Sequence, residues 1–265
     1  MTAVSTTPVS PALPDTLDLA GTRPVPLTRL IRVEMRKMRD TRAGTWLLAV
    51  LGGVAVAVMV GVFIVGDAND RTFLDLLSVA SIPLSFMLPV LGILLICSEW
   101  GQRTALVTFT LTPHRGRVLG AKIVAALLFA LGAIAVAAVP AAILAAVGGA
   151  DDPWSNVSVG LLARVLLAFV LGVAWGLAFG AALLNSALAI VAYFLVPVLV
   201  SIVGGIWTGI ADKVVWFDLN QSSSALYGTD AMSGSDWAHI GTGVLLWIVL
   251  PGAIGTWRVL RSEVK

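Results

Sequence analysis

The side chains that could catalyse a reaction or hold a metal ion are few in this sequence, and they form no recognisable set. His114 and His239 are the only histidines, and Cys97 is the only cysteine. No HExxH motif and no Ser/His/Asp arrangement can be assembled, and a single cysteine excludes an internal disulfide. No lysine follows a glycine, so the Gly-Lys pair of a phosphate-binding P-loop is absent. We therefore expect no catalytic residue, no metal ion and no cofactor on this chain.

The composition indicates an integral membrane protein. Of the 265 residues, 58% are hydrophobic and 12% are charged, and the mean hydropathy is +0.96. A soluble domain contains about 25% charged residues, because its surface must be hydrated. This chain has too few charges to cover a soluble fold of its length, which argues strongly against a soluble enzyme.

The hydropathy pattern predicts an all-α membrane protein with six transmembrane helices within residues 45–257. The apolar runs are 45–65, 78–97, 118–147, 157–184, 187–210 and 238–257, each long enough to cross a bilayer at 1.5 Å per residue. Basic residues gather before the first run, between the second and third, and in 258–265, whereas most acids lie in the other connections. The positive-inside rule therefore places both termini in the cytoplasm. Residues 1–26, rich in proline and without an apolar stretch, are expected to form a disordered cytoplasmic tail.

Residues 27–44 have the pattern of an amphipathic helix lying on the inner leaflet. One face carries leucine, isoleucine and methionine, and the other carries basic residues that include Arg32 and Arg36. Glu34 falls within the apolar face, where an unpaired carboxylate destabilises the fold. We therefore expect Glu34 to meet a cation or a hydrogen-bond donor.

No acid lies near the middle of any predicted span. Because ion-coupled transporters depend on intramembrane ionisable groups, this absence disfavours a proton-coupled secondary transporter and a channel with charged rings. If the protein moves a cargo, its energy source is expected on another chain. The glycines at 172, 176 and 180 predict close helix contact, either within the chain or at a dimer seam.

Two segments carry a resemblance to a known family. The segment 98–122 has an acidic residue at the end of the second span, a Gly/Arg/Thr cluster, a proline with nearby basic residues, and a lysine that opens the third span. These positions are Glu99, Gly101, Arg103, Thr104, Pro113, Arg115, Arg117 and Lys122. With Glu34 and Lys37 in the preceding helix, they resemble the permease subunits of the type-2 ABC transporter family, particularly the small six-helix type of high-GC Gram-positive bacteria. The resemblance covers about residues 27–261, and Gly116 departs from it where many relatives have a basic residue.

The resemblance implies a permease of the bacterial plasma membrane that works with other subunits. Its loop 98–117 would contain a coupling helix, over about 104–111, that docks on a cytoplasmic ABC ATPase, with Glu99 bonded to Thr104 or Arg103. Two ATPase copies would bind ATP and magnesium, and a second permease would complete a homodimer or heterodimer. The alternative is a basic loop held at lipid headgroups.

The resemblance also implies a cargo path along the second and fifth spans and a cap made by the outer loop 211–237. Candidate path residues are Ser81, Ser85, Phe86, Tyr193 and Phe194, for which core packing is the alternative. Candidate cap residues are Trp216, Phe217 and Tyr227, for which membrane anchoring is the alternative. We expect an exporter, and the apolar path with few charges favours amphiphilic or hydrophobic cargo, with lipids as neighbours and no nucleic acid. A membrane scaffold or sensor that recruits cytosolic partners is the rival, and a secondary transporter comes third.

Overall fold

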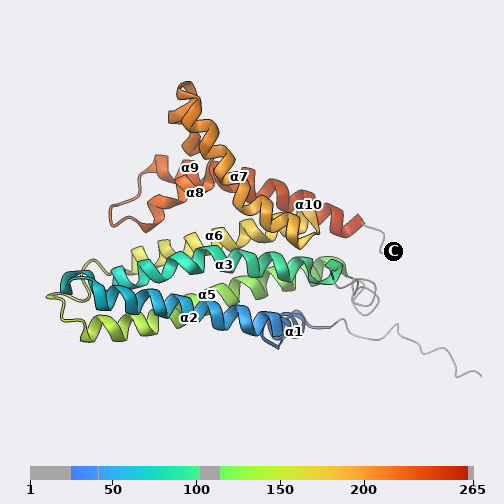
Figure 1. Ribbon diagram of the computed structural model, residues 1–265. Helices are drawn as coiled ribbons and strands as arrows, with labels where there is room; N and C mark the ends of the chain where they lie inside the picture. The colour runs from blue at the N-terminus through green and yellow to red at the C-terminus, as the bar shows by residue number, and fades with distance from the viewer. Residues whose placement is uncertain (1–24, 41, 102–113, 262–265) are drawn as a thin grey trace, which may run out of the picture.

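The computed structural model describes residues 25–40, 42–101 and 114–261, and this part of the chain is helical with no β-strand. The predicted tail thus lies almost entirely outside the described residues, as does the predicted coupling helix. A short helix α1 (Leu27–Asp40) comes first, and long helices follow it. Figure 1 shows α2, α3, α5 and α6 lying side by side, with α7 diverging from them.

The six predicted spans are confirmed as six helices long and apolar enough to cross a membrane. They are α2 (Arg42–Val65), α3 (Phe73–Gly101), α5 (Arg115–Val147), α6 (Val159–Leu183), α7 (Ser186–Ile206) and the continuous run of α9 (Gly234–Val244), η4 (Leu245–Val249) and α10 (Leu250–Arg261). The outer faces of α2, α5 and α7 expose many large apolar side chains. Six apolar helices with such faces indicate a multi-pass membrane protein.

Helix α3 is the centre of the bundle, since it packs against α2, α5 and α6. Its buried side chains, among them Leu76, Leu84 and Leu88, form the main core with alanines of α5 and apolar residues of α6. The helix α1, the facing ends of α3 and α5, and the end of α10 all lie at one end of the bundle (Figure 1). That end holds the basic segments, as the charge pattern predicts.

Glycines let α6 approach its neighbours within this chain. A Cβ atom on Gly176 would lie 2.6 Å from the carbonyl oxygen of Pro89, and one on Gly180 would lie 3.3 Å from Cα of Ile93. Both contacts are with α3. The small-residue pattern of α6 therefore serves helix packing inside the chain, the first of its two predicted uses.

The outer loop folds into short helices, η2 (Thr208–Trp216), α8 (Leu219–Ser223) and η3 (Ser224–Tyr227). They pack along the bundle, because Leu219 of α8 shares an apolar cluster with Trp175 and Phe179 of α6. Trp175 is about 24 Å along α6 from the start of that helix, at 1.5 Å per residue. The loop therefore returns alongside the middle of the long helices.

Candidate functional site

A ring of four alternating charges lies where α1, α3 and α5 meet. The Lys122 ammonium is 2.8 Å from Oε2 of Glu34 and 3.2 Å from Oε1 of Glu99. The Lys37 ammonium is 2.6 Å from Oε1 of Glu34 and 3.3 Å from the same Oε1 of Glu99. Each lysine thus contacts both carboxylates, and each carboxylate contacts both lysines. We call Glu34, Lys37, Glu99 and Lys122 the charge ring.

The sequence places these four groups on three helices. Glu34 and Lys37 are one turn apart on α1, Glu99 is in the last turn of α3, and Lys122 is in the second turn of α5. Lys122 also donates a hydrogen bond to the carbonyl of Leu95, at 3.2 Å. The expectation that Glu34 meets a cation is confirmed, and it meets two.

The charge ring is buried, and its formal charges cancel. The side chains of Lys122, Glu99 and Glu34 are 2%, 3% and 5% exposed, whereas Lys37 is 40% exposed. Burial of ions is costly unless opposite charges and hydrogen bonds compensate it. This arrangement holds α1 against the ends of α3 and α5 with no net charge.

The ionisation of Lys37 follows from its two partners. Burial lowers its pKa, but the hydrogen bond and charge of Glu34, together with Glu99, outweigh that effect and raise the pKa above the ordinary 10.5. The Lys37 side chain therefore stays protonated through neutral pH and keeps the ring balanced.

Two further basic residues of the predicted coupling site are bound to the same chain. Arg115 donates to the carbonyl of Val259 in α10 at 3.1 Å, and Arg117 donates to the carbonyl of Val25, just before α1, at 2.7 Å. The start of α5 is therefore fastened to α10 and to the beginning of α1. Arginines suit this role because the guanidinium offers several donors in a fixed plane.

The other residues of the predicted coupling site are less constrained or undescribed. Gly101 ends α3 and is exposed, with nothing near the position of a Cβ. Arg103, Thr104 and Pro113 lie outside the described residues, so the bond from Glu99 to Thr104 or Arg103 stays a prediction. The second oxygen of Glu99, Oε2, is buried and has no hydrogen-bond partner among the described residues, which leaves it available as an acceptor.

The predicted helix 27–44 corresponds in part to α1, which ends at Asp40, whereas residues from Arg42 onward belong to α2. The polar face of α1 is exposed as expected. Arg32 and Arg36 are both exposed, and Glu34 and Met38 are buried on the opposite face. That face packs against α5 and α2. Its position at a membrane surface stays a prediction.

The fold gathers four of the five predicted path residues around one cavity. This cavity, about 620 Å³ in volume, lies between α3, α6, α7 and the short helices of the outer loop. Ser85, Phe86, Tyr193 and Phe194 line it, and the Phe86 and Phe194 rings stack with centroids 5.9 Å apart. Ser81 lines a separate, smaller cavity, and its hydroxyl donates to the carbonyl of Leu77.

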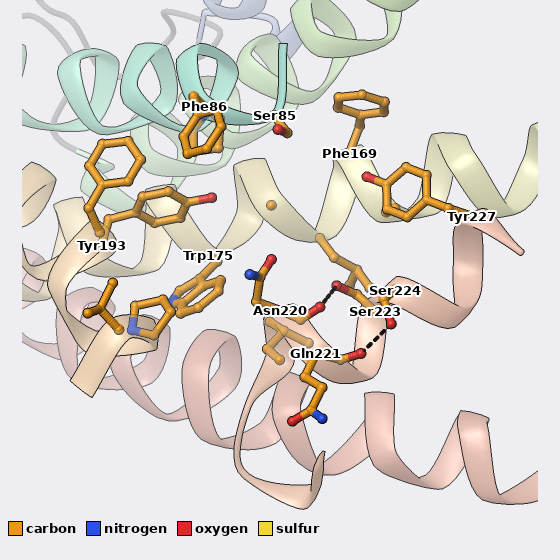
Figure 2. A pocket seen from close by; sticks show the side chains of 18 residues that line it. Ser85, Phe86, Phe169, Trp175, Tyr193, Asn220, Gln221, Ser223, Ser224 and Tyr227 are labelled. Atoms are coloured by element: carbon orange, nitrogen blue, oxygen red, sulfur yellow. Dashed lines mark hydrogen bonds between the residues drawn. The ribbon is translucent and has the colours of Figure 1, made fainter. Parts of the chain in front are cut away.

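The three predicted cap residues divide between two places. Tyr227 lines the cavity of Ser85 and Phe86 (Figure 2) and also the smaller cavity of Ser81. Trp216 packs edge-on against His239 of α9, at 4.3 Å between ring centroids. Phe217 is exposed at its ring, and its carbonyl accepts a 2.5 Å hydrogen bond from the indole of Trp247.

Asp218, an acid that was not predicted as a site residue, is brought by the fold to the middle of the bundle. It is 5% exposed, and it caps α8 by accepting from the backbone N–H groups of Asn220 and Gln221 and from the hydroxyl of Ser201 in α7. The spacing of Asp218 and Gln221 fits the capping-box pattern and could have indicated a helix start. Hydropathy gave no signal, because it treats 211–237 as a segment outside the membrane.

Among the described residues, no group of three or more His, Cys, Asp and Glu side chains could hold a metal ion. Comparison of the sequence with protein-family models gave no match, and comparison with curated proteins gave none either. The charge ring and the cavity are therefore the features from which a function must be argued.

Proposed function

We propose that this chain is the membrane-spanning permease subunit of an ABC transporter in the bacterial plasma membrane. In this proposal it exports amphiphilic or hydrophobic cargo, and a separate cytoplasmic ATPase, present in two copies with ATP and magnesium, supplies the energy. A second permease, identical or related, completes the assembly. The charge ring is the observation that carries the proposal.

The ring ties together the two helices between which the predicted coupling segment runs. Residues 102–113 connect α3 to α5, Glu99 lies just before that segment, and Arg115, Arg117 and Lys122 lie just after it. Both ends of the segment are therefore bonded to α1, α10 or each other. A force applied to 102–113 by a docked ATPase would move α1, α3 and α5 together.

Helix α3 connects the ring to the cavity. Glu99 and Ser85 stand 14 residues apart on the same helix, which corresponds to about 21 Å. A tilt or rotation of α3 at the ring would therefore change the wall of the cavity that Ser85 and Phe86 form. This geometry supports coupling between a cytoplasmic engine and a cargo path.

The orientation of the chain supports the same proposal. The end of the bundle with the charge ring also carries the basic residues of α1, of the start of α5 and of α10. By the positive-inside rule this end faces the cytoplasm, where an ATPase is found. The short helices α8 and η3 would then enter the membrane from the outer side and cap the cavity.

A proton-coupled transporter is the second candidate, and Asp218 is the observation that favours it. Intramembrane acids are functional candidates by default. The contacts of Asp218 favour capping instead, because two backbone N–H groups and one hydroxyl already occupy its carboxylate. Uptake driven by a proton gradient without any ATPase, and lost in Asp218→Asn, would establish this candidate.

The proposal is tested by purification of the chain from its native membranes in mild detergent. We expect an ATPase subunit to co-purify and its ATP turnover to rise when the pair is reconstituted in liposomes. Arg103→Ala should lower both association and stimulated turnover, whereas Arg36→Ala, on the exposed face of α1, serves as the matched control. Association and turnover unchanged in Arg103→Ala would contradict the coupling role. Cytosolic partners without any ATPase among them would support the scaffold instead.

A further inference from the structure

The cavity lined by Ser85, Phe86, Tyr193 and Phe194 has two chemically different kinds of lining. Aromatic rings come from three long helices, with Phe86 on α3, Trp175 on α6, and Tyr193 and Phe194 on α7. Polar side chains come mainly from the outer loop, where Asn220, Gln221, Ser223 and Ser224 contribute amides and hydroxyls. A volume of about 620 Å³ lies within the roughly 300–1,000 Å³ range of small-molecule sites.

The polar groups converge on the open middle of this cavity. Figure 2 shows the hydroxyls of Tyr193 and Tyr227 and the carboxamide of Asn220 pointing toward it from different sides, with Ser85 opposite Asn220. The rings of Phe86 and Phe169 flank the same space (Figure 2). A ligand there would meet hydrogen-bonding groups around its edge and flat aromatic surfaces beside it.

Among the described residues that line the cavity, no side chain carries a formal charge, since they include no Asp, Glu, Lys, Arg or His. The buried Asp218 lies one residue before the lining, and its carboxylate is engaged in capping α8. The Tyr227 phenol lines the same cavity and can donate a hydrogen bond. An ionic ligand would therefore find no counter-charge among the described lining residues.

The converging polar groups need partners at this depth. The Ser223 and Ser224 hydroxyls donate to carbonyls of their own helix turn, but the structure shows no hydrogen bond for the Asn220 carboxamide among the described residues. Leu219, its neighbour, packs beside Trp175, about 24 Å along α6. Asn220 is exposed in the wall of the cavity, and a polar group without a partner would be destabilising there if the bilayer surrounds this part of the bundle. Water or the hydroxyls of a ligand must therefore satisfy it.

We propose that this cavity binds the uncharged, hydroxyl-rich headgroup of an amphiphile, such as a neutral glycolipid. Sugar hydroxyls would bond the Asn220 carboxamide and the Tyr193 and Tyr227 hydroxyls, while the apolar face of the ring would lie on the aromatic rings. The lipid chains would lie beside the cavity along exposed apolar side chains of α3 and α7, which include Phe86 and Val198. Identification of this amphiphile as the cargo rests on the proposed function, but its binding does not.

The test is photo-labelling of the full chain in phosphatidylcholine nanodiscs without any ATPase. One probe is a glucosyl diacylglycerol with a photoreactive acyl chain, and the other is a phosphatidylglycerol with the same chain. We expect the glucosyl probe to label peptides of α3 and α7, where the acyl chain would lie, more strongly than the anionic probe. Octyl glucoside should compete with it better than free glucose or a phosphocholine detergent of equal chain length.

Two variants examine the polar groups separately. Tyr227→Phe removes one hydroxyl, and Asn220→Leu removes the carboxamide. Each substitution should weaken competition by octyl glucoside roughly threefold to tenfold. This factor corresponds to the loss of one hydrogen bond of about 0.5–1.5 kcal/mol. Asn69→Leu is the matched control, since Asn69 is exposed in η1 (Ala68–Asp70) away from the cavity.

Three results would overturn the proposal: equal labelling by both probes, unchanged competition in both variants, or equal competition by free glucose. Because no ATPase is present, these outcomes are distinct from failure of the proposed function. Loss of ATPase coupling with specific labelling retained would contradict only the transport proposal.

Discussion

Removal of the Lys122 ammonium should be the most damaging single change in the bundle. Lys122 is 2% exposed, lies 2.8 Å from Glu34 and 3.2 Å from Glu99, and donates to the carbonyl of Leu95. Lys122→Met keeps the length of the side chain but leaves two buried carboxylates with only Lys37 between them. Loss of one partner of a buried ion pair costs about 3–5 kcal/mol. We expect the free energy of unfolding to fall by that amount.

The assay is reversible unfolding by SDS in mixed micelles, followed by tryptophan fluorescence. The control is Lys213→Met, the same substitution at an exposed position of η2, which should change stability by less than about 0.5 kcal/mol.

A double-mutant cycle then separates the charge effect from packing. Lys122→Met combined with Glu34→Gln removes one charge of each sign and leaves Lys37 paired with Glu99 at 3.3 Å. The double variant should be more stable than the sum of the two single effects predicts, by roughly 1–3 kcal/mol. Additive effects, or a loss below about 1 kcal/mol for Lys122→Met, would refute the account of the charge ring.

Three further predictions concern packing, pH and the outer loop. Gly176→Ala places a Cβ 2.6 Å from the Pro89 carbonyl oxygen and should destabilise by about 1–3 kcal/mol, whereas Gly61→Ala, with open space around it, should be neutral or stabilising in the same SDS titration. The folded-state pKa of Lys37 is raised above 10.5. The contribution of Lys37 to the free energy of unfolding is therefore complete below that pH and is lost as the pH rises through the folded-state pKa. The stability difference between wild type and Lys37→Met should thus be constant from neutral pH to about 10 and shrink above it. Asp218→Ala removes the cap of α8 and should cost about 0.5–2 kcal/mol, seen as faster proteolysis within 211–237 in nanodiscs.

Each of these has a contrary outcome. Equal effects of the two glycine substitutions would show that α6 does not pack closely on α3. A Lys37 contribution that grows above pH 10.5 would reverse the inferred sign of its pKa shift. Proteolysis unchanged in Asp218→Ala would show that the cap does not hold the outer helices in place.

The long helices could be predicted from sequence because burial in lipid requires a continuous apolar run. The predicted ends of these helices agree less well with the observed ends, because hydropathy depends on composition and not on backbone hydrogen bonding. The fifth span was predicted to reach residue 210, whereas α7 ends at Ile206 and an apolar 3-10 helix follows. Val214 of that helix packs on Gly204, where a Cβ would clash with the Val214 side chain. Likewise, α3 and α5 extend into both ends of the predicted loop 98–117.

From the sequence, a partner for Glu34 could be predicted, but the four residues of the charge ring could not be identified. The position of Glu34 within an apolar face required a partner, but the partner Lys122 is 88 residues away and shares no local pattern with it. The resemblance to a permease family grouped the same residues without giving their contacts. Asp218 was missed for a related reason, because only the tertiary fold carries its segment back alongside α6.

Photo-crosslinking in native membranes tests the central claim, that the segment between α3 and α5 is the contact for an ATPase. A photoreactive amino acid at Thr104 is compared with one at Asp151, which is exposed in the connection between α5 and α6, at the other end of the bundle from the charge ring (Figure 1). We predict that position 104 cross-links to a subunit that contains a nucleotide-binding P-loop and that position 151 does not. Cross-links from position 104 only to lipids or to proteins without such a motif would contradict the account.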